Sequence, residues 1–274
     1  MATSAPSPHR LVGVSTKMYF DLAKTAQYTS QVLSHLQHFL PKLHQSTDVF
    51  LIPDFLSIIP CRQAIEEFNK TASPPVPLIL GAQNTHYQDA GAFTGEVSPL
   101  QLSQAGVKIV EIGHAERRRY FGETDAWVVL KAKAALRNGM TPLICIGEQK
   151  KEGGVENAVE ECWQQVSGVF DDADVLKDSK SKEIVLAFEP VWAIGASEPA
   201  PAEHVVAVTK ALRQRCQAAK GFEGSVRILY GGSAGPGLFD KLKDGVDGLF
   251  LGRFAHDPER FAKTVVEVGG GFGV

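Results

Sequence analysis

Short runs of apolar residues recur along the chain, and most are continuously apolar rather than alternating. Such runs are typical of strands that are buried on both faces of a parallel sheet. The pattern predicts strands at Leu11–Lys17, Asp48–Pro53, Leu78–Asn84, Lys108–His114, Pro142–Gly147, Ile184–Pro190, Val226–Gly232 and Leu249–Arg253. Amphipathic stretches between them predict helices, among them Leu22–Leu40, Ala126–Arg137, Val155–Phe170, Ala202–Ala219 and Glu259–Val266.

Strands that alternate with helices imply parallel pairing through right-handed crossovers. Eight such units within 274 residues favour an α/β fold consisting of a single (β/α)8 barrel over residues 11–268. An open doubly wound sheet would alternate similarly, but no Gly-x-Gly-x-x-Gly follows the first predicted strand. Residues 1–10 are expected to form a flexible arm and residues 269–274 a flexible tail.

Composition narrows the classes of partner. The formal net charge of -3 argues against a nucleic-acid or membrane surface as the main partner, although a few local groups could still hold a phosphate. The four cysteines are widely separated and form no Cys-x-x-Cys pair, so neither a metal site nor a disulfide framework is expected. The first ten residues contain no apolar signal segment, and reduced thiols in the cytoplasm are the default reading.

In a barrel of this kind, reactive groups follow the carboxyl ends of the strands. Glu189 ends the sixth apolar run, where it is either an ion-paired carboxylate or a general base whose basicity is set by partial desolvation. His114 ends the fourth run, and such a histidine is either structural or a proton carrier. Lys17 ends the first run, as a snorkelling surface lysine or as a cation that stabilises a phosphate or an enolate oxygen.

Glycines follow the last two predicted strands. Gly231 and Gly232 precede Ser233 after the seventh strand, and Gly252 precedes Arg253 at the end of the eighth. Barrel phosphate sites are commonly built from these two loops, where glycines let backbone N–H groups approach an anion. The placement predicts an anion site there.

Several collinear motifs resemble the triosephosphate isomerase family. They span about Leu11 to Val266 and comprise Gly81-Ala-Gln-Asn84, Gly91-Ala-Phe-Thr-Gly-Glu96, Glu111-Ile-Gly-His-Ala-Glu-Arg-Arg118, Pro142-Leu-Ile-Cys-Ile-Gly-Glu148, Phe188-Glu-Pro-Val-Trp-Ala-Ile-Gly195 and Tyr230-Gly-Gly-Ser233. The resemblance implies a TIM barrel that interconverts an aldose and a ketose of a short sugar phosphate through an enediolate. It also implies a role in glycolysis and gluconeogenesis.

The same resemblance assigns roles to residues. It implies that Glu189 is the base, His114 the neutral electrophile and Lys17 the stabilising cation, with Glu116 behind that lysine. Residues 190–200 would close over the substrate, no metal or organic cofactor would be needed, and a homodimer would form through the Gly91–Glu96 loop. The expected substrate and phosphate contacts are Ser15, Gly195, Gly231, Gly232, Ser233, Gly252 and Arg253.

The chain departs from the family pattern at several of these positions. Ser15 replaces an asparagine, Ala115 replaces a serine, Arg253 replaces a glycine, and the closing loop reads Gly195-Ala-Ser-Glu-Pro-Ala200. Three functions are therefore open. The first is triose phosphate isomerisation between glyceraldehyde 3-phosphate and dihydroxyacetone phosphate. The second is isomerisation of a four-carbon ketose phosphate such as an erythrulose phosphate, and the third is a non-catalytic phosphate-binding barrel.

Overall fold

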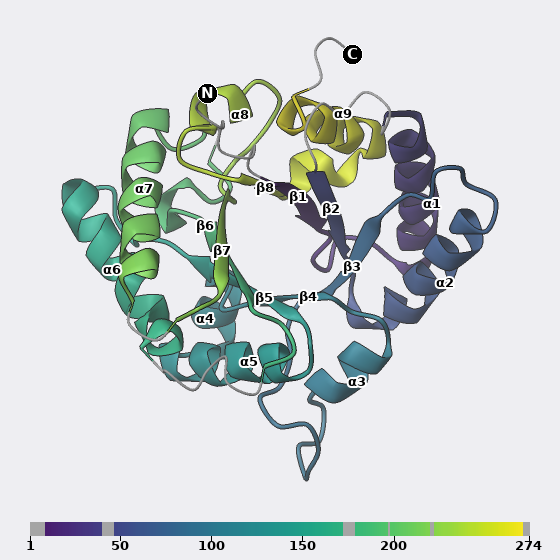
Figure 1. The fold of residues 1–274 in the computed structure, drawn as a ribbon, viewed down its shortest axis with the longest axis horizontal. Coiled ribbons are helices and arrows are strands. Elements are labelled where there is room, and N and C mark those ends of the chain that lie inside the picture. The colour runs from purple at the N-terminus through teal and green to yellow at the C-terminus, as the bar shows by residue number, and fades with distance from the viewer. Residues whose placement is uncertain (1–8, 40–46, 172–178, 197, 220–221, 271–274) are drawn as a thin grey trace, which may run out of the picture.

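The computed structural model describes residues 9–39, 47–171, 179–196, 198–219 and 222–270. Within these residues, eight parallel strands close into a barrel in chain order (Figure 1). They are β1 (Arg10–Ser15), β2 (Thr47–Ile52), β3 (Leu78–Ala82), β4 (Ile109–Ile112), β5 (Thr141–Ile146), β6 (Glu183–Phe188), β7 (Ser225–Tyr230) and β8 (Gly248–Leu251). The predicted single (β/α)8 barrel is confirmed.

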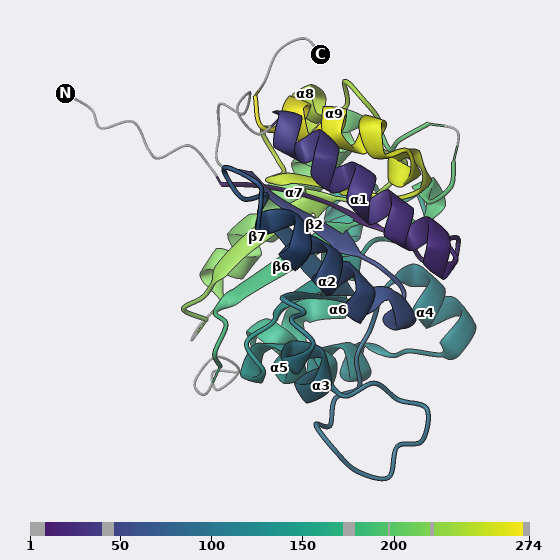
Figure 2. The same ribbon diagram turned by 90° about the vertical axis from the view of Figure 1, so that its right-hand side faces the viewer.

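Helices surround this barrel and cover the outer faces of its strands (Figure 1). They are α1 (Leu22–Phe39), α2 (Ile58–Asn69), α3 (Pro99–Gln104), α4 (Ala115–Phe121), α5 (Asp125–Arg137), α6 (Gly154–Phe170), α7 (Ala202–Ala218), α8 (Phe239–Leu242) and α9 (Pro258–Val268). In the part of the chain that the structure describes, three 3-10 turns accompany them, η2 (Phe55–Ser57), η3 (Val191–Ala193) and η4 (Arg253–His256). In Figure 2 the segment between β3 and α3, which contains Gly91–Glu96, projects from the barrel.

Side-chain caps define where several helices begin. The Thr124 hydroxyl accepts a hydrogen bond from the backbone N–H of Trp127 and so satisfies a free donor at the start of α5. Asp257 caps α9 in the same way, and Pro258 follows at the first helical position, where a missing N–H costs nothing. The five helices predicted above begin and end within about two residues of those observed.

Two apolar layers hold the barrel together. One lies between strands and helices, and the other fills the barrel interior with side chains that include Leu11, Phe50, Leu143 and Phe250. Gly13 makes room for the Phe50 ring, because a Cβ at position 13 would lie 2.2 Å from that ring. The interior is thus packed, and the space for a ligand lies above it, at the carboxyl ends of the strands.

The predicted strands were too long at their carboxyl ends. Lys17, His114 and Glu189 all lie beyond the last residue of β1, β4 and β6, respectively. The backbone leaves the sheet there, and Lys17 takes a positive φ of 48°. At the other boundary, Arg10 belongs to β1 rather than to the predicted arm, because it pairs with Thr47 and donates a hydrogen bond to the Val246 carbonyl. Residues 1–8 of that arm and 271–274 of the predicted tail lie outside the described residues.

Candidate active site

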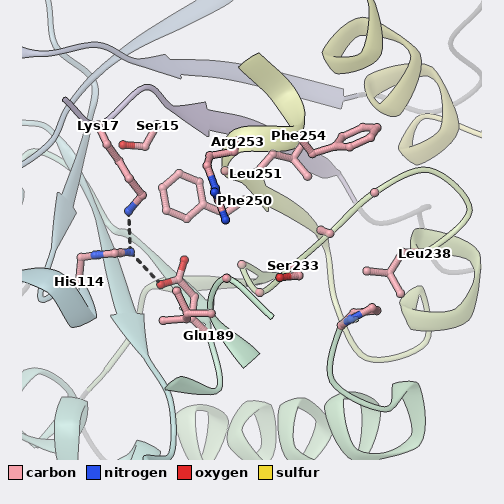
Figure 3. A pocket seen from close by; sticks show the side chains of 18 of the residues that line it. Ser15, Lys17, His114, Glu189, Ser233, Leu238, Phe250, Leu251, Arg253 and Phe254 are labelled. Carbon is pink, nitrogen blue, oxygen red and sulfur yellow. Dashed lines mark hydrogen bonds and ion pairs between the residues drawn. The ribbon is translucent and has the colours of Figure 1, made fainter. Parts of the chain in front are cut away.

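A cavity of about 690 Å³ opens at the carboxyl ends of the strands. All of the site residues predicted from the sequence line it, and Figure 3 shows several of them facing one another across it. They are Ser15, Lys17, His114, Glu116, Glu189, Gly195, Gly231, Gly232, Ser233, Gly252 and Arg253. The barrel therefore brings together residues that are up to about 240 positions apart in the sequence.

Lys17, His114 and Glu189 meet at one end of this cavity. The Lys17 ammonium nitrogen lies 2.9 Å from His114 Nε2, and that same ring nitrogen lies 3.4 Å from Glu189 Oε2 (Figure 3). Both the imidazole and the carboxylate are buried, with 5% of each residue exposed. Three ionisable groups thus converge where the three strands β1, β4 and β6 end.

The histidine is neutral, and its proton position is determined by the start of α4. Burial and the nearby Lys17 charge lower the pKa of His114 to about 3. Its Nδ1 accepts the backbone N–H of Glu116, the second residue of α4, at 3.2 Å. Since Nδ1 acts as an acceptor, the ring proton resides on Nε2, the nitrogen that faces the cavity; in this tautomer Nε2 does not accept from the Lys17 ammonium 2.9 Å away, and both groups are donors toward the cavity. The ring is therefore ready to donate a hydrogen bond to a substrate oxygen.

Glu189 has the environment of a base. Burial raises its pKa to about 8, Lys17 opposes that rise, and the carboxylates of Glu111 and Glu116 add to it. A carboxylate whose pKa lies near the operating pH accepts a proton from carbon more readily than an exposed glutamate does. Its Oε2 has no hydrogen-bond partner among the described residues, so this oxygen is free to receive a proton.

Lys17 is held charged and in place. Burial acts to lower its pKa, but the carboxylates of Glu111, Glu189 and Glu116 outweigh that effect, and the pKa is raised. The ammonium donates a hydrogen bond to Glu116 Oε2 at 3.1 Å. The Gln83 side chain donates to the Lys17 carbonyl at 2.9 Å and supports the left-handed backbone at this residue.

The other end of the cavity is formed by the loops after β7 and β8. Gly231 and Gly232 are closely approached, since a Cβ on Gly231 would lie 2.4 Å from Glu189 Oε1 and one on Gly232 would lie 2.2 Å from the Tyr230 hydroxyl. The Arg253 guanidinium points into the cavity (Figure 3), and one of its nitrogens lies 3.9 Å from where a Cβ of Gly195 would be. Guanidinium and closely approached backbone suit an oxyanion such as a phosphate.

Hydrogen bonds anchor the loop between β6 and α7 at both ends. At its start, the Trp192 indole N–H donates to Glu148 Oε1 at 2.9 Å, and His204 Nε2 lies 2.9 Å from the same oxygen. At its end, the backbone N–H of Ala200 donates to the Tyr230 hydroxyl at 2.9 Å. The Ser233 hydroxyl donates to the carbonyl of Ala196 at 2.9 Å, so this predicted phosphate contact uses its side chain to hold the loop.

Sequence reasoning did not assign roles to several of these groups. Glu148 and Tyr230 anchor the loop through contacts that join different barrel units, which no local pattern reveals. Glu111 lies inside the quoted Glu111–Arg118 motif but points into the barrel near Lys17, where its carboxyl is buried. An acidic residue within an otherwise apolar predicted strand is a signal that could have identified Glu111. Such a residue is rarely buried unless it has a partner or a function.

Two further observations concern other classes of site. In the part of the chain that the structure describes, no group of three His, Cys, Asp or Glu residues could hold a metal ion. No helix among these residues is both long enough and apolar enough to cross a membrane.

The fold and the site together define a class of protein. A buried carboxyl group, an imidazole and a lysine lie at the carboxyl end of a (β/α)8 barrel, opposite glycine-rich loops and an arginine, and such groups can move protons on an anionic substrate.

Comparison with known proteins supports this class and narrows it. A family model for triosephosphate isomerase matches residues 10–268. A protein of Pectobacterium atrosepticum named L-erythrulose-1-phosphate isomerase is 45% identical over 251 residues, covering 91% of this chain and 92% of that protein. A protein of Rhizobium etli with the same name is 37% identical over 261 residues, covering 94% and 91%. The triosephosphate isomerase of Thermoanaerobacter pseudethanolicus is 36% identical over 245 residues, covering 86% and 93%.

The chain therefore belongs to the triosephosphate isomerase family, and it is an isomerase. The family resemblance inferred from the sequence motifs is confirmed.

Proposed function

We propose that this isomerase acts on a four-carbon ketose 1-phosphate of the erythrulose type. Two observations support the choice. The proton-transfer pair is complete, with His114 Nε2 and Glu189 Oε2 3.4 Å apart in one cavity. In addition, a relative named as such an isomerase is 45% identical to this chain, against 36% for the triosephosphate isomerase of Thermoanaerobacter pseudethanolicus. The first observation supports the reaction type, and the second favours the four-carbon substrate over the three-carbon one.

The substrate phosphate is assigned to the loops after β7 and β8. Gly231, Gly232, Ser233 and Gly252 line this end of the cavity, with open space beside Gly252, and Arg253 offers a permanent positive charge. Gly195, at the tip of the loop between β6 and α7, faces Arg253 across the cavity. A phosphate held here directs the carbon chain toward Lys17, His114 and Glu189 at the opposite end (Figure 3).

The phosphate ester decides which way the carbonyl moves. In a ketose 1-phosphate the C1 oxygen belongs to the ester, so C1 cannot become the aldehyde while the ester persists. The proton must instead leave C3, on the far side of the C2 carbonyl. The reaction on a four-carbon substrate is therefore a ketose-to-ketose shift, whereas on dihydroxyacetone phosphate the same step yields an aldose.

Each residue of the site has its own role in this proton transfer. Glu189 takes the C3 proton while His114 Nε2–H and the Lys17 ammonium stabilise the negative charge that develops on O2. The imidazole then moves a proton between O2 and O3 of the enediolate, and Glu189 returns its proton to C2. The product carries its carbonyl at C3, and both side chains regain their starting protonation. Ser15 contributes a small side chain where the family pattern has an asparagine, which leaves room for the fourth carbon.

Turnover measurements test the proposal directly. Purified protein is assayed with erythrulose 1-phosphate and with dihydroxyacetone phosphate, and isomerisation in D₂O is followed by NMR for deuterium at the carbon that receives the proton. We expect kcat/KM to be at least about tenfold higher for the four-carbon substrate. A preference for dihydroxyacetone phosphate would instead assign triose phosphate isomerisation and a place in glycolysis and gluconeogenesis. Thermal stabilisation by both compounds without turnover of either would indicate a non-catalytic phosphate-binding barrel.

The oligomeric state is part of the same proposal. We assign a homodimer through the Gly91–Glu96 loop, which projects from the barrel (Figure 2) and exposes 41% of Phe93. Met18, beside the catalytic lysine, is 95% exposed and suits the same interface. A change of Thr94 to arginine is expected to shift the mass measured by sedimentation from dimer to monomer. We place the enzyme in the cytoplasm, where four buried free thiols stay reduced.

A further inference from the structure

The barrel interior contains a carboxylate that the proton-transfer steps do not use. Glu111 lies on β4, opposite Leu143 of β5, and only 3% of the residue is exposed. Its neighbours along the interior are apolar or weakly polar, such as Ile109 and Cys145. Its Oε2 has no hydrogen-bond partner among the described residues. A buried carboxylate with an unpaired oxygen is costly unless a neighbouring donor reaches it.

A second unpaired polar group faces the same place. Ser15 is the last residue of β1, only 2% of it is exposed, and its hydroxyl oxygen makes no full hydrogen bond within the described part of the chain. This side chain lines the cavity next to Lys17 (Figure 3), whereas Glu111 is not among the residues that line it. The two residues are neighbours, because the Ser15 hydroxyl favours the charged form of Glu111 and limits the rise that burial imposes on the pKa of that carboxyl.

The position of this pair matches one part of the substrate. The phosphate loops lie at one end of the cavity, and Ser15 lies at the other, near the catalytic lysine (Figure 3). With C1 anchored at the phosphate loops and C3 beside Glu189, the terminal C4 hydroxymethyl group extends away from the phosphate. Dihydroxyacetone phosphate has no carbon at that position. A hydroxyl is both donor and acceptor, which is what a serine backed by a carboxyl group can satisfy.

We propose that Ser15 and Glu111 form the subsite for the terminal hydroxymethyl group of a four-carbon ketose phosphate. The substrate hydroxyl donates to Ser15 Oγ, and the Ser15 hydroxyl donates in turn to the Glu111 carboxylate. A three-carbon substrate leaves Ser15 Oγ without the donor that the substrate hydroxyl supplies, and a site built to bind a hydroxyl discriminates strongly against the analogue that lacks it. This inference rests on the proposed four-carbon substrate, and it identifies the residues that select it.

The test compares substitutions by their effect on two substrates. Ser15→Ala removes the hydroxyl, and Glu111→Leu removes the carboxyl at similar volume. Glu111 also acts on the pKa values of Lys17 and Glu189, but that effect applies to both substrates and cancels in the ratio of their kcat/KM values. Thr16→Val is the matched control, because Thr16 is a fully buried hydroxyl residue adjacent to Ser15 that does not line the cavity.

We expect Ser15→Ala and Glu111→Leu each to lower the ratio of kcat/KM for erythrulose 1-phosphate over dihydroxyacetone phosphate by about tenfold or more. Thr16→Val is expected to leave this ratio unchanged. A parallel loss on both substrates in the two test variants would overturn the subsite, because it would indicate a purely structural or electrostatic role. If Glu111→Leu does not fold, Ser15→Ala and Glu111→Gln decide the question.

A binding measurement separates this inference from the proposed function. In a Glu189→Gln background, which removes the base, calorimetry gives the dissociation constants of erythrulose 1-phosphate and dihydroxyacetone phosphate without turnover. The subsite predicts tighter binding of the four-carbon compound and loss of that preference on adding Ser15→Ala. A wild-type enzyme that binds erythrulose 1-phosphate through Ser15 but turns over only the triose would refute the proposed function alone. Equal binding of both compounds, unaffected by Ser15→Ala, would refute the subsite.

Discussion

Gly231 lies directly against the carboxylate of Glu189, and a single methyl group there tests the position of the base. A Cβ on residue 231 would lie 2.4 Å from Oε1, 2.6 Å from Cγ and 2.9 Å from Cδ of Glu189. Ordinary van der Waals contact begins at 3.4 Å. The Gly231→Ala change therefore forces the carboxylate to retreat by about 1 Å, because three of its atoms are too close at once.

The expected cost falls on catalysis rather than on folding. The φ of Gly231 lies outside the left-handed region, so alanine suits the backbone, and the obstructing atoms belong to a side chain that can move. A displacement of about 1 Å between reacting groups lowers the rate by about 100-fold, which corresponds to about 2.7 kcal/mol of activation free energy. KM is expected to change less than kcat, because the new methyl group faces Glu189, whereas the Gly231 N–H already donates to the Phe188 carbonyl at 2.9 Å and the rest of the phosphate loops is unchanged.

The assay measures kcat for isomerisation of whichever substrate the wild type prefers, together with the melting temperature. Gly235→Ala serves as the control, since Gly235 lines the same cavity but a Cβ there meets only Phe254, at an ordinary 3.9 Å. Retention of kcat within about threefold in Gly231→Ala would refute the assignment of Glu189 as a precisely positioned base. An equal loss in Gly235→Ala would point to a general disturbance of the loop.

Four further outcomes follow from the geometry. Because burial raises the pKa of Glu189 to about 8, kcat/KM is expected to rise with pH and level off near that value, and a flat profile below it would contradict the assignment. In the folded state Glu189 keeps its proton at pH values above its ordinary pKa of 4.5, so its contribution to the free energy of unfolding falls as the pH rises from 4.5 to about 8. Denaturant titrations at several pH values would detect this fall. Tyr230→Phe removes the acceptor for the Ala200 N–H and is expected to lower kcat/KM about fivefold, with the melting temperature as the check that folding is intact. Gly13→Ala places a methyl group against the Phe50 ring and is expected to destabilise the fold by about 1–3 kcal/mol in urea unfolding, whereas an unchanged midpoint would show that the interior can repack.

The sequence alone was sufficient for the barrel, and it singled out the polar residues that the structure brings together in one cavity. Eight continuously apolar runs are separated by stretches that include amphipathic ones. A strand that is buried on both faces must consist almost entirely of apolar residues, so such strands are recognisable in the sequence. The polar residues that end these runs, including Lys17, His114 and Glu189, stand out because charge at the end of an apolar strand is costly. Both the apolar runs and the polar residues that end them can be read from the order of residues along the chain.

The strand boundaries and the supporting contacts depended on tertiary structure. The strands end before the reactive residues because the backbone must turn out of the sheet to aim their side chains into the cavity, as the φ of 48° at Lys17 shows. Contacts such as Trp192 with Glu148, and Ala200 with Tyr230, join barrel units that lie 44 and 30 residues apart in the chain. No periodic pattern encodes such pairs.

The same distinction applies to the chemistry. Sequence reasoning identified a histidine, a glutamate and a lysine, but their residue types do not reveal their protonation. Closure of the barrel buries His114 and Glu189 within 3.4 Å of each other, and this burial lowers the pKa of the imidazole to about 3 and raises that of the carboxyl to about 8. Only the tertiary structure determines how far each group is removed from water, and desolvation is the largest cause of both shifts.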